Sequence, residues 1–510
     1  MNMNQPAPRN AIDENRQGLI GQPVNRVDGR LKVTEQAPYA YEIREASNPA
    51  YGFIVGATIA KGNVAEIDAS AAEQAPGVLL VYTHHNVPKQ AAWGPLDAKN
   101  RYSRASPQLG SAQIRHHGEA VAFVVAQTFE QARAAAQLVK VRYAAEPGDC
   151  ALEPKLAQAE IPPDNTGEEG AKTDSAIGDF TSAFMAAAVQ VDATYTTPVH
   201  IHAPMEPHAT LAYWTDGRVH IHCAAQLLES AQMAVANTLQ IAPDKVRIVS
   251  RYIGGGFGGK LPVYGDVMLS ALAARQLGRP VKTALTRQQM FHFTTHRSQT
   301  VQRVRLGATA DGRLTAIGHD TWQHCARFDN FCEPTAMATR TLYAAPNRRT
   351  THRLLKLDLP VADSTRAPGE AVGLLALEHA MDELAEKLGL DPVELRLRNE
   401  PKLDPEKQVP YSSRQLVACL QQGAQRFGWA DRKSLPANTA RPLARRHGHG
   451  RVHPRQPAAA VQMQRFSGQA GAPDRAHGHD RHRYGQLHRV HANRGRDAGF
   501  ADGPRANAAG

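Results

Sequence analysis

A glycine-rich run at residues 254–260 is the first feature whose composition could support chemistry. It contains five glycines, with Phe257 as its only bulky apolar residue. A backbone with so few Cβ atoms can adopt positive φ and bring its amides directly against a ligand. The run follows an apolar segment at 246–253 and precedes a helical pattern at 266–277. That order predicts an anionic cofactor held at the start of a helix. The alternative is a tight strand-to-helix turn without a ligand.

Two common phosphate-binding fingerprints do not fit this run. Leu261 follows Lys260, where a P-loop has Ser or Thr, and the glycine spacing is not that of a dinucleotide-binding turn. Three further candidates lie elsewhere in the chain. They are Gln226, the pair Glu206 and His208, and an Arg-Ala-Pro-Gly turn that begins at residue 366.

In this order and spacing, the residues resemble the molybdenum-binding subunit of the xanthine oxidase family, especially the bacterial aldehyde oxidoreductases. The resemblance extends from about Gln22 to about Asn399. It implies a cofactor of molybdenum on molybdopterin cytosine dinucleotide, with Gln226 donating its amide to an oxo group. No side chain is expected to ligate the metal. The cofactor-binding residues implied are Gln226, Gly255, Gly256, Phe257, Gly258 and Arg366.

The resemblance also implies the reaction and the partners. An aldehyde becomes a carboxylic acid with oxygen from water, and electrons pass to 2Fe-2S and FAD groups on an iron–sulfur subunit and an FAD-binding subunit. Leu261 stands in the substrate pocket where purine-oxidising members carry glutamate. Leucine would leave a purine's polar edge unpaired, which favours aldehydes. A non-catalytic assembly fragment and a xanthine dehydrogenase subunit are the alternatives.

Several other polar groups are interpreted structurally. Glu206 and His208 are expected to shape a loop rather than bind metal. The pairs His84-His85 and His116-His117 and the segment 322–332 show no spacing that indicates a site. Five separated cysteines, without a C-x-x-C pair, are expected to be reduced thiols.

Hydrophobic patterning predicts an α/β (α+β) fold. Alternating strands and helices over 18–145 resemble the family's hammerhead domain, and a linker rich in Pro, Gly and acidic residues follows at 146–179. Residues 180–440 are expected to form the first molybdopterin-binding domain. Residues 1–17 are expected to be disordered.

Local signals place individual helices. Apolar residues at alternating spacings of three and four over 374–388, with Gly389 behind them, predict a core helix and its C-cap. Capping boxes are predicted at Thr128-x-x-Gln131 and Ser70-x-x-Glu73.

The composition changes at residue 441. Residues 441–510 hold 13 Arg and four Asp but no Lys or Glu, which gives +9 of the formal net charge of +11. Shifting plausible codons for 441–447 and 479–490 by one nucleotide yields segments that resemble the family. A frameshift near 441 and an unstructured tail are therefore predicted. The family's second molybdenum domain and its glutamate base would lie beyond this point, so the chain is expected to lack a catalytic residue and to be inactive.

Other function classes are disfavoured. No run approaches 18 apolar residues, so no membrane span is expected. The basic tail has only Phe466, Tyr484 and Phe500 as stacking platforms, so nucleic acid is not an expected partner. The N-terminus lacks an apolar export signal, which favours the cytoplasm. Periplasmic location by co-export with a signal-bearing partner is the alternative.

Overall fold

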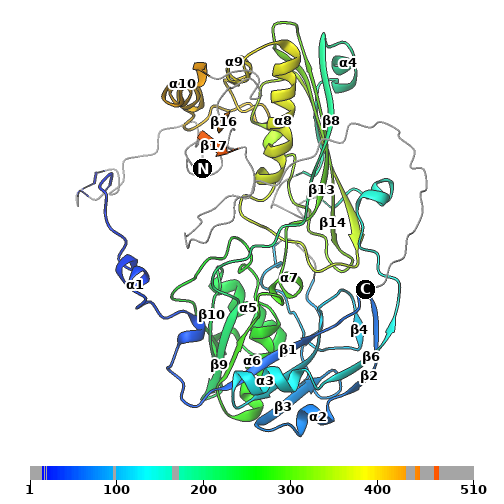
Figure 1. Cartoon of the computed structure of the whole chain (residues 1–510), viewed down its shortest axis with the longest axis vertical. Coiled ribbons are helices and arrows are strands. Elements are labelled where there is room, and N and C mark those ends of the chain that lie inside the picture. Colours follow the sequence, from blue (N-terminus) through cyan, green and yellow to red (C-terminus); the bar gives the residue numbers. More distant parts are fainter. Residues whose placement is uncertain are drawn as a thin grey trace, which may run out of the picture.

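Two large β-sheets form the body of the described chain, one in each half of Figure 1. The computed structural model describes residues 14–15, 18, 20–95, 99–163 and 172–431, together with the backbone of two short strands at 443–447 and 465–469. The predictions of a disordered N-terminus over 1–17 and of an unstructured tail over 441–510 therefore fall largely outside the described residues. The mixed α/β architecture confirms the predicted fold class.

The first sheet has seven strands in the order β11-β10-β9-β12-β1-β5-β3. Strand β1 runs parallel to β12, with Ala50 opposite Val281. This pairing joins strands from before the predicted linker to strands from after it, so one continuous sheet spans both segments. Its strands are β1 (Ala50–Gly56), β3 (Val78–Thr83), β5 (Ala120–Ala126), β9 (Ala209–Thr215), β10 (Arg218–Cys223), β11 (Val246–Val249) and β12 (Val281–Ala284).

Helices pack on this sheet through small apolar side chains. The helix α6 (Gly265–Leu277) is buried from Gly265 to Ala274 and shares one core with α5 (Leu228–Leu239) and with the strands. The helix α3 (Phe129–Ala136) begins with the predicted capping box, because the Thr128 hydroxyl accepts from the backbone N–H of Gln131. The capping box predicted at Ser70 is wrong. Ser70 is the first residue of α2 (Ser70–Glu73), and its hydroxyl donates to Asp68 instead.

The second sheet has five strands in the order β7-β15-β14-β13-β8. The helix α8 (Glu370–Leu388) packs on one face through Leu377, Met381 and Leu384, which confirms the predicted core helix. The helix α4 (Phe180–Met185) lies on the other face, because Ala316 and Ile317 are neighbours on β14 and contact α4 and α8 respectively. The strands are β7 (Ser175–Ile177), β8 (Val189–Thr197), β13 (Thr300–Ala308), β14 (Leu314–Ala326) and β15 (Asn347–Leu357).

Smaller elements complete the described part. A three-stranded sheet has the order β4-β2-β6, and β16 pairs antiparallel with β17. These strands are β2 (Gly62–Asp68), β4 (Gln113–Ile114), β6 (Lys140–Ala145), β16 (Leu443–His447) and β17 (Arg465–Gln469). The remaining helices are α1 (Gly29–Val33), α7 (Met290–Phe293), α9 (Pro392–Arg398) and α10 (Leu416–Phe427). Among the described residues, no helix has the length and apolar character needed to cross a bilayer.

Candidate functional site

Three distant sequence motifs meet at the glycine-rich loop between β11 and α6. The backbone N–H of Gln226, just before α5, donates to the carbonyl of Lys260 at 2.7 Å. The backbone N–H of Arg366, just before α8, donates to the carbonyl of Phe257 at 2.9 Å. Gln226, the loop and Arg366 therefore form one surface, which we call the loop edge.

The side chain of Gln226 is held in one orientation. Its Oε1 atom accepts hydrogen bonds from the backbone N–H groups of Gly258 and Lys260, at 3.1 and 3.2 Å. Because both donors lie on the loop, the amide NH2 group is the end that remains for another acceptor. Gln226 is exposed, and within the described residues its NH2 group has no protein partner.

The backbone of the loop edge is conformationally unusual. Phe257 has φ of +54° and is 45% exposed, and Ala367 has φ of +56°. Bulky residues rarely adopt this region, because Cβ approaches the following carbonyl oxygen. Residues in such conformations cluster at functional sites. The Arg366 side chain between them is exposed and makes no ion pair within the described residues.

The loop glycines are explained by contacts within the protein. A Cβ on Gly258, whose φ is +99°, would lie 2.1 Å from the carbonyl oxygen of Ser364. A Cβ on Gly256 would lie 2.4 Å from Oε1 of Gln226, and one on Gly255 would lie 3.0 Å from the Phe257 ring. These contacts by themselves account for the glycines, and the expectation that the backbone amides of the loop contact a ligand stays a prediction. The glycines let the loop pack closely against its own chain.

The predicted anion site at the start of α6 is wrong. The first turn of α6 is buried, and it contains the carboxylate of Asp266. The hydroxyl of Thr210 donates to Oδ2 of that carboxylate at 2.7 Å, and Oδ1 is buried without a hydrogen-bond partner among the described residues. Burial raises the pKa of Asp266 to about 6. The helix start is thus already occupied by a side chain of the protein.

A buried group of polar residues supports the loop from behind. The Lys260 ammonium donates to Oε2 of Glu206 at 2.8 Å, and the same oxygen accepts from the backbone N–H of Gly254 at 2.7 Å. His208 Nε2 lies 2.8 Å from the carbonyl of Gly259, and burial lowers the pKa of His208 to about 3, which leaves it neutral. Glu206 and His208 therefore shape the loop, as the sequence predicted.

A second buried pair supports the turn that carries Arg366. The guanidinium of Arg297 donates to Glu333 at 2.8 Å, and to the carbonyls of Thr365, Arg366 and Ala367 at 2.7, 2.9 and 3.1 Å. The same Glu333 oxygen accepts from the backbone N–H of the turn glycine at position 369, at 2.8 Å. Sequence analysis missed this pair, because no local pattern links positions 36 residues apart on different elements.

Leu261 directly follows the loop, and the other predicted groups do not form a site. Leu261 is half-buried, its backbone N–H donates to the carbonyl of Gly258 at 3.2 Å, and it does not line the nearby cavity that Pro262, Val263 and Tyr264 contact. All five cysteines are described, and none forms a disulfide. Within residues 20–95, 99–163 and 172–431, no cluster of three or more His, Cys, Asp or Glu side chains is arranged to hold a metal ion.

Two protein-family models match this chain, one before and one after the predicted linker. The family model of the molybdopterin cofactor-binding domain matches residues 160–400. That of the aldehyde oxidase and xanthine dehydrogenase a/b hammerhead domain matches residues 34–147. The chain belongs to the xanthine dehydrogenase family. This confirms the resemblance that the motifs indicated.

Individual relatives agree with this assignment. The chain is 45% identical over 439 residues to the aldehyde oxidoreductase molybdenum-binding subunit PaoC of Escherichia coli strain K12, covering 86% of this chain and 58% of that protein. It is 31% identical over 423 residues to the putative xanthine dehydrogenase molybdenum-binding subunit XdhA of the same strain, covering 80% and 56%. The chain thus spans somewhat more than half the length of these relatives.

Solved structures show the same fold. The aldehyde oxidoreductase from Desulfovibrio gigas matches with a TM-score of 0.72 and 25% identity, over 83% of this chain and 48% of that one. Quinoline 2-oxidoreductase from Pseudomonas putida 86 matches with a TM-score of 0.72 and 23% identity, over 84% and 56%.

The loop edge fits a molybdopterin cofactor chemically. The cofactor carries thiolate and phosphate groups, so it needs hydrogen-bond donors and positive charge more than protein ligands to the metal. The outward NH2 group of Gln226 is such a donor, and the exposed guanidinium of Arg366 is such a charge. Neither group has a competing protein acceptor within the described residues.

Proposed function

We propose that this chain is the molybdenum-cofactor-binding part of an aldehyde oxidoreductase, which converts an aldehyde into a carboxylic acid with water as the oxygen source. The proposed cofactor is molybdenum on molybdopterin cytosine dinucleotide. The proposed partners are an iron–sulfur subunit with a 2Fe-2S group and an FAD-binding subunit. Similarity to PaoC, 45% identical, supports the aldehyde class over the xanthine class, whose relative XdhA is 31% identical.

The observation that carries the proposal is the convergence of Gln226, Phe257 and Arg366 on one edge. They come from three different connections of the fold, and each presents a group that the protein itself leaves unpaired or exposed. If these residues served only to stabilise a turn, we would expect the NH2 group of Gln226 and the guanidinium of Arg366 to donate to acceptors within the protein.

Each residue would have a distinct part in holding the cofactor. The NH2 group of Gln226 would donate a hydrogen bond without adding charge. Gly255, Gly256 and Gly258 would shape the backbone beside the metal, and the guanidinium of Arg366 would offset negative charge. The ring of Phe257 would exclude water from that side. The cofactor, when bound, supplies the two-electron oxidation chemistry.

The proposal is tested best with Gln226→Glu. Glutamate retains an oxygen that accepts from Gly258 and Lys260, but it replaces the NH2 donor by a carboxylate oxygen. The test uses protein whose reading frame is restored near residue 441, as do all molybdenum measurements below. We expect co-expression of this variant with the partner subunits to give at least tenfold less bound molybdenum than the frame-restored parent, measured by inductively coupled plasma mass spectrometry. Acid hydrolysis of the parent should release CMP if the cofactor is the cytosine dinucleotide.

The matched control is Gln240→Glu at the exposed C-cap of α5, which adds the same charge away from the loop edge. Equal molybdenum content in the parent and both variants would contradict the role assigned to Gln226. In the frame-restored protein, turnover of xanthine equal to that of an aromatic aldehyde would contradict the aldehyde class and the role of Leu261.

We also propose the domain limits 18–145 and 180–440, joined by a linker at 146–179, and a frameshift near residue 441. The composition of 441–510, with 13 Arg but neither Lys nor Glu, supports the frameshift. Resequencing the gene tests it. A shifted frame that encodes a further family domain would support it, and stop codons within about 50 codons would contradict it. A cytoplasmic location, with periplasmic co-export as the alternative, is tested by fractionation.

A further inference from the structure

A cavity of about 740 Å³ lies behind the loop edge, between the polypeptide before β5 and the loops around α6, α7 and β15. None of Gln226, Phe257 or Arg366 lines it. It nevertheless touches the same loop. Tyr264 lines the cavity, and its hydroxyl donates to the carbonyl of Gly259 at 2.8 Å. The volume falls within the range of small-molecule sites in proteins, about 300–1,000 Å³.

Two of the three arginines that line this cavity have carboxylate partners. Arg101 donates to Asp329 at 2.7 and 2.9 Å and to Asp363 at 2.9 Å. Arg115 donates to Glu119 through its Nε atom at 2.8 Å. Both guanidinium groups are therefore neutralised by the protein.

Arg104 differs from these two neighbours. It is half-buried, and its guanidinium makes no ion pair or hydrogen bond within the described residues. Burial is the main cause that lowers the pKa of Arg104. The carboxylates of Asp329 and Asp363 act on Arg104 from a distance and partly offset this lowering, but both are hydrogen-bonded to Arg101. A ligand carboxylate would therefore be the first direct partner of the Arg104 guanidinium.

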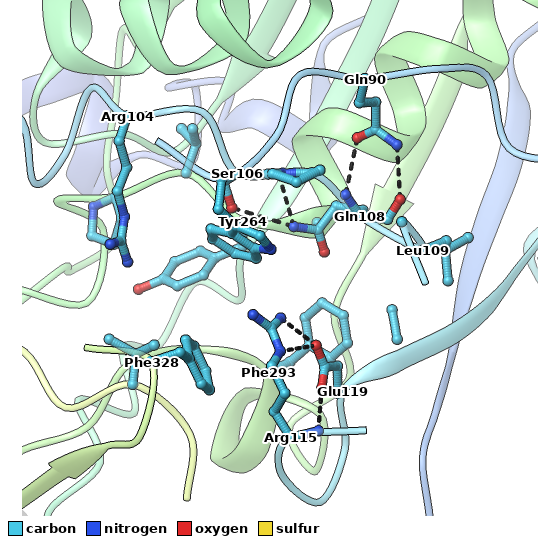
Figure 2. Close-up of a pocket in the computed structure, with 18 of the residues that line it drawn as sticks. Gln90, Arg104, Ser106, Gln108, Leu109, Arg115, Glu119, Tyr264, Phe293 and Phe328 are labelled. Atoms are coloured by element: carbon cyan, nitrogen blue, oxygen red, sulfur yellow. Dashed lines mark hydrogen bonds and ion pairs between the residues drawn. The ribbon is translucent and has the colours of Figure 1, made fainter. Parts of the chain in front are cut away.

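One aromatic ring, that of Trp93, lies beside the Arg104 guanidinium, and the Arg115 guanidinium lies over the rings of both Trp93 and Phe328. The guanidinium carbon of Arg104 lies 5.7 Å from the ring centroid of Trp93. The guanidinium carbon of Arg115 lies 4.8 Å from the Trp93 ring and 4.1 Å from the Phe328 ring. Figure 2 shows Arg104 and Phe328 facing the same open space, with the Arg115–Glu119 pair along its edge.

We propose that this cavity binds a planar aromatic carboxylate, with the carboxylate on Arg104 and the ring against the exposed side chain of Trp93. A guanidinium matches a carboxylate through two parallel hydrogen bonds, and aromatic rings favour offset stacking. Inorganic phosphate suits the site less well, because Lys89, the second lining cation without an ion pair among the described residues, is exposed to solvent, and aromatic rings form part of the wall.

The ligand class has a consequence for turnover. An aromatic carboxylate is the kind of product that oxidation of an aromatic aldehyde releases, so its retention behind the loop would slow the reaction. This link rests on the proposed function. Binding of the carboxylate does not depend on it.

The binding test uses 2-naphthoate as the probe and the full chain of residues 1–510. We expect saturable binding by isothermal titration calorimetry, with a Kd on the order of 10⁻⁴ M for a ligand of this size. Arg104→Gln should weaken binding at least tenfold, and Arg104→Lys should weaken it less. Arg133→Gln, at an exposed position on α3, is the matched control and should leave the Kd unchanged. Circular dichroism should show equal folding of the four proteins.

Two further probes separate the parts of the proposal. The neutral 2-naphthylmethanol should bind more weakly than 2-naphthoate, and its affinity should not change in Arg104→Gln. Phosphate should not compete with 2-naphthoate at equal concentration. No binding of 2-naphthoate, equal Kd in the parent and Arg104→Gln, or effective competition by phosphate would each overturn the proposal.

The same titration distinguishes this proposal from the proposed function. Binding of 2-naphthoate to protein that never acquires molybdenum would support the cavity site and count against the cofactor assignment. Protein that holds molybdenum but does not bind 2-naphthoate would overturn the cavity site alone.

Discussion

The two sides of the glycine-rich loop use polar residues in opposite ways. On the loop edge, Gln226 and Arg366 are exposed and present groups without protein partners in the described part of the chain. Behind the loop, the Lys260 and Arg297 side chains are almost completely buried, and each is paired with a glutamate. The buried side fixes the backbone, and the exposed side is left available for a ligand.

This contrast shows that charge by itself does not identify a ligand-binding residue. The buried guanidinium of Arg297, with its four protein acceptors, stabilises the fold and is not available to a ligand. Removing one of its partners would leave a buried charge without compensation. An exposed guanidinium can be removed at little cost to folding. Substitutions on the two sides should therefore separate stability from cofactor binding.

The largest effect on stability is expected from Glu333→Ala. It leaves the buried Arg297 without its carboxylate and the Gly369 N–H without its acceptor. Loss of one partner of a buried pair typically costs about 3–5 kcal/mol in the free energy of unfolding. Urea unfolding followed by circular dichroism measures this loss. Glu333→Gln should lose less, because its amide oxygen can still accept.

The control for this prediction is Glu394→Ala, which removes the exposed partner of Arg398 on α9. An exposed pair of this kind is worth at most about 0.5 kcal/mol. If Glu333→Ala and Glu394→Ala lower the free energy of unfolding equally, burial does not determine how much the Arg297–Glu333 pair contributes to stability.

Acidification should destabilise the protein next most strongly, through one buried histidine behind the loop, His208, and two in the second sheet, His319 and His352. Burial lowers the pKa of His208 and His319 to about 3 and that of His352 to about 4, from an ordinary value of 6.5. Their contribution to the free energy of unfolding is fully present above pH 6.5. It is lost as the pH falls toward the pKa values of the folded protein, because these histidines are then protonated in the unfolded chain but not in the folded one. Each group contributes a slope of about 1.4 kcal/mol per pH unit. The raised pKa values of Asp266 and Glu333 offset part of this loss.

Urea unfolding at pH 7.5, 6.5 and 5.5 measures this slope. The variant His319→Gln should reduce the slope of the free energy of unfolding against pH by the share of one histidine, about 1.4 kcal/mol per pH unit. This holds whatever the variant's effect at pH 7.5. A free energy of unfolding that does not change between pH 6.5 and 5.5 would contradict the buried, neutral state of these histidines.

Phe257→Gly should change stability only slightly. Glycine relieves the strain of φ at +54°, about 1–2 kcal/mol, but it also makes the unfolded chain more flexible, so the net gain is at most about 1 kcal/mol. The bound molybdenum should decrease, because the exposed ring is lost. Gln240→Gly, at φ of +55° on α5, should stabilise similarly and leave the molybdenum content unchanged. A marked loss of stability in Phe257→Gly would assign the ring to packing.

The smallest stability effect is expected from Arg366→Gln. Because its side chain is exposed and unpaired in the described part, the free energy of unfolding should change by less than about 0.5 kcal/mol. Molybdenum content should nevertheless fall at least tenfold in co-expressed protein. Unchanged molybdenum content would remove Arg366 from the cofactor site and weaken the comparison between the two sides.

Local sequence signals predicted many of the elements well. The apolar repeat before Gly389 became α8, and the Thr128 capping box became the start of α3. These features depend on residues within one or two helical turns, so short-range rules are sufficient. The Ser70 capping box failed because the helix begins at Ser70 itself, with Ala69 at the N-cap, so the Ser70 hydroxyl does not accept from a first-turn N–H group.

The sequence by itself indicated the family and the candidate residues Gln226, Phe257 and Arg366, because their types, order and spacing along the chain resemble the motifs of that family. Only the tertiary structure decided that these residues form one edge, that the glycines serve the packing of the loop, and that Arg297 supports the Arg366 turn. It also brought Trp93, Arg104 and Phe328 to one cavity. The physical reason is that hydrogen bonds and ion pairs form between residues that are close in space. When those residues are 36 to more than 200 positions apart in the chain, no periodic pattern in the sequence reveals the pairing.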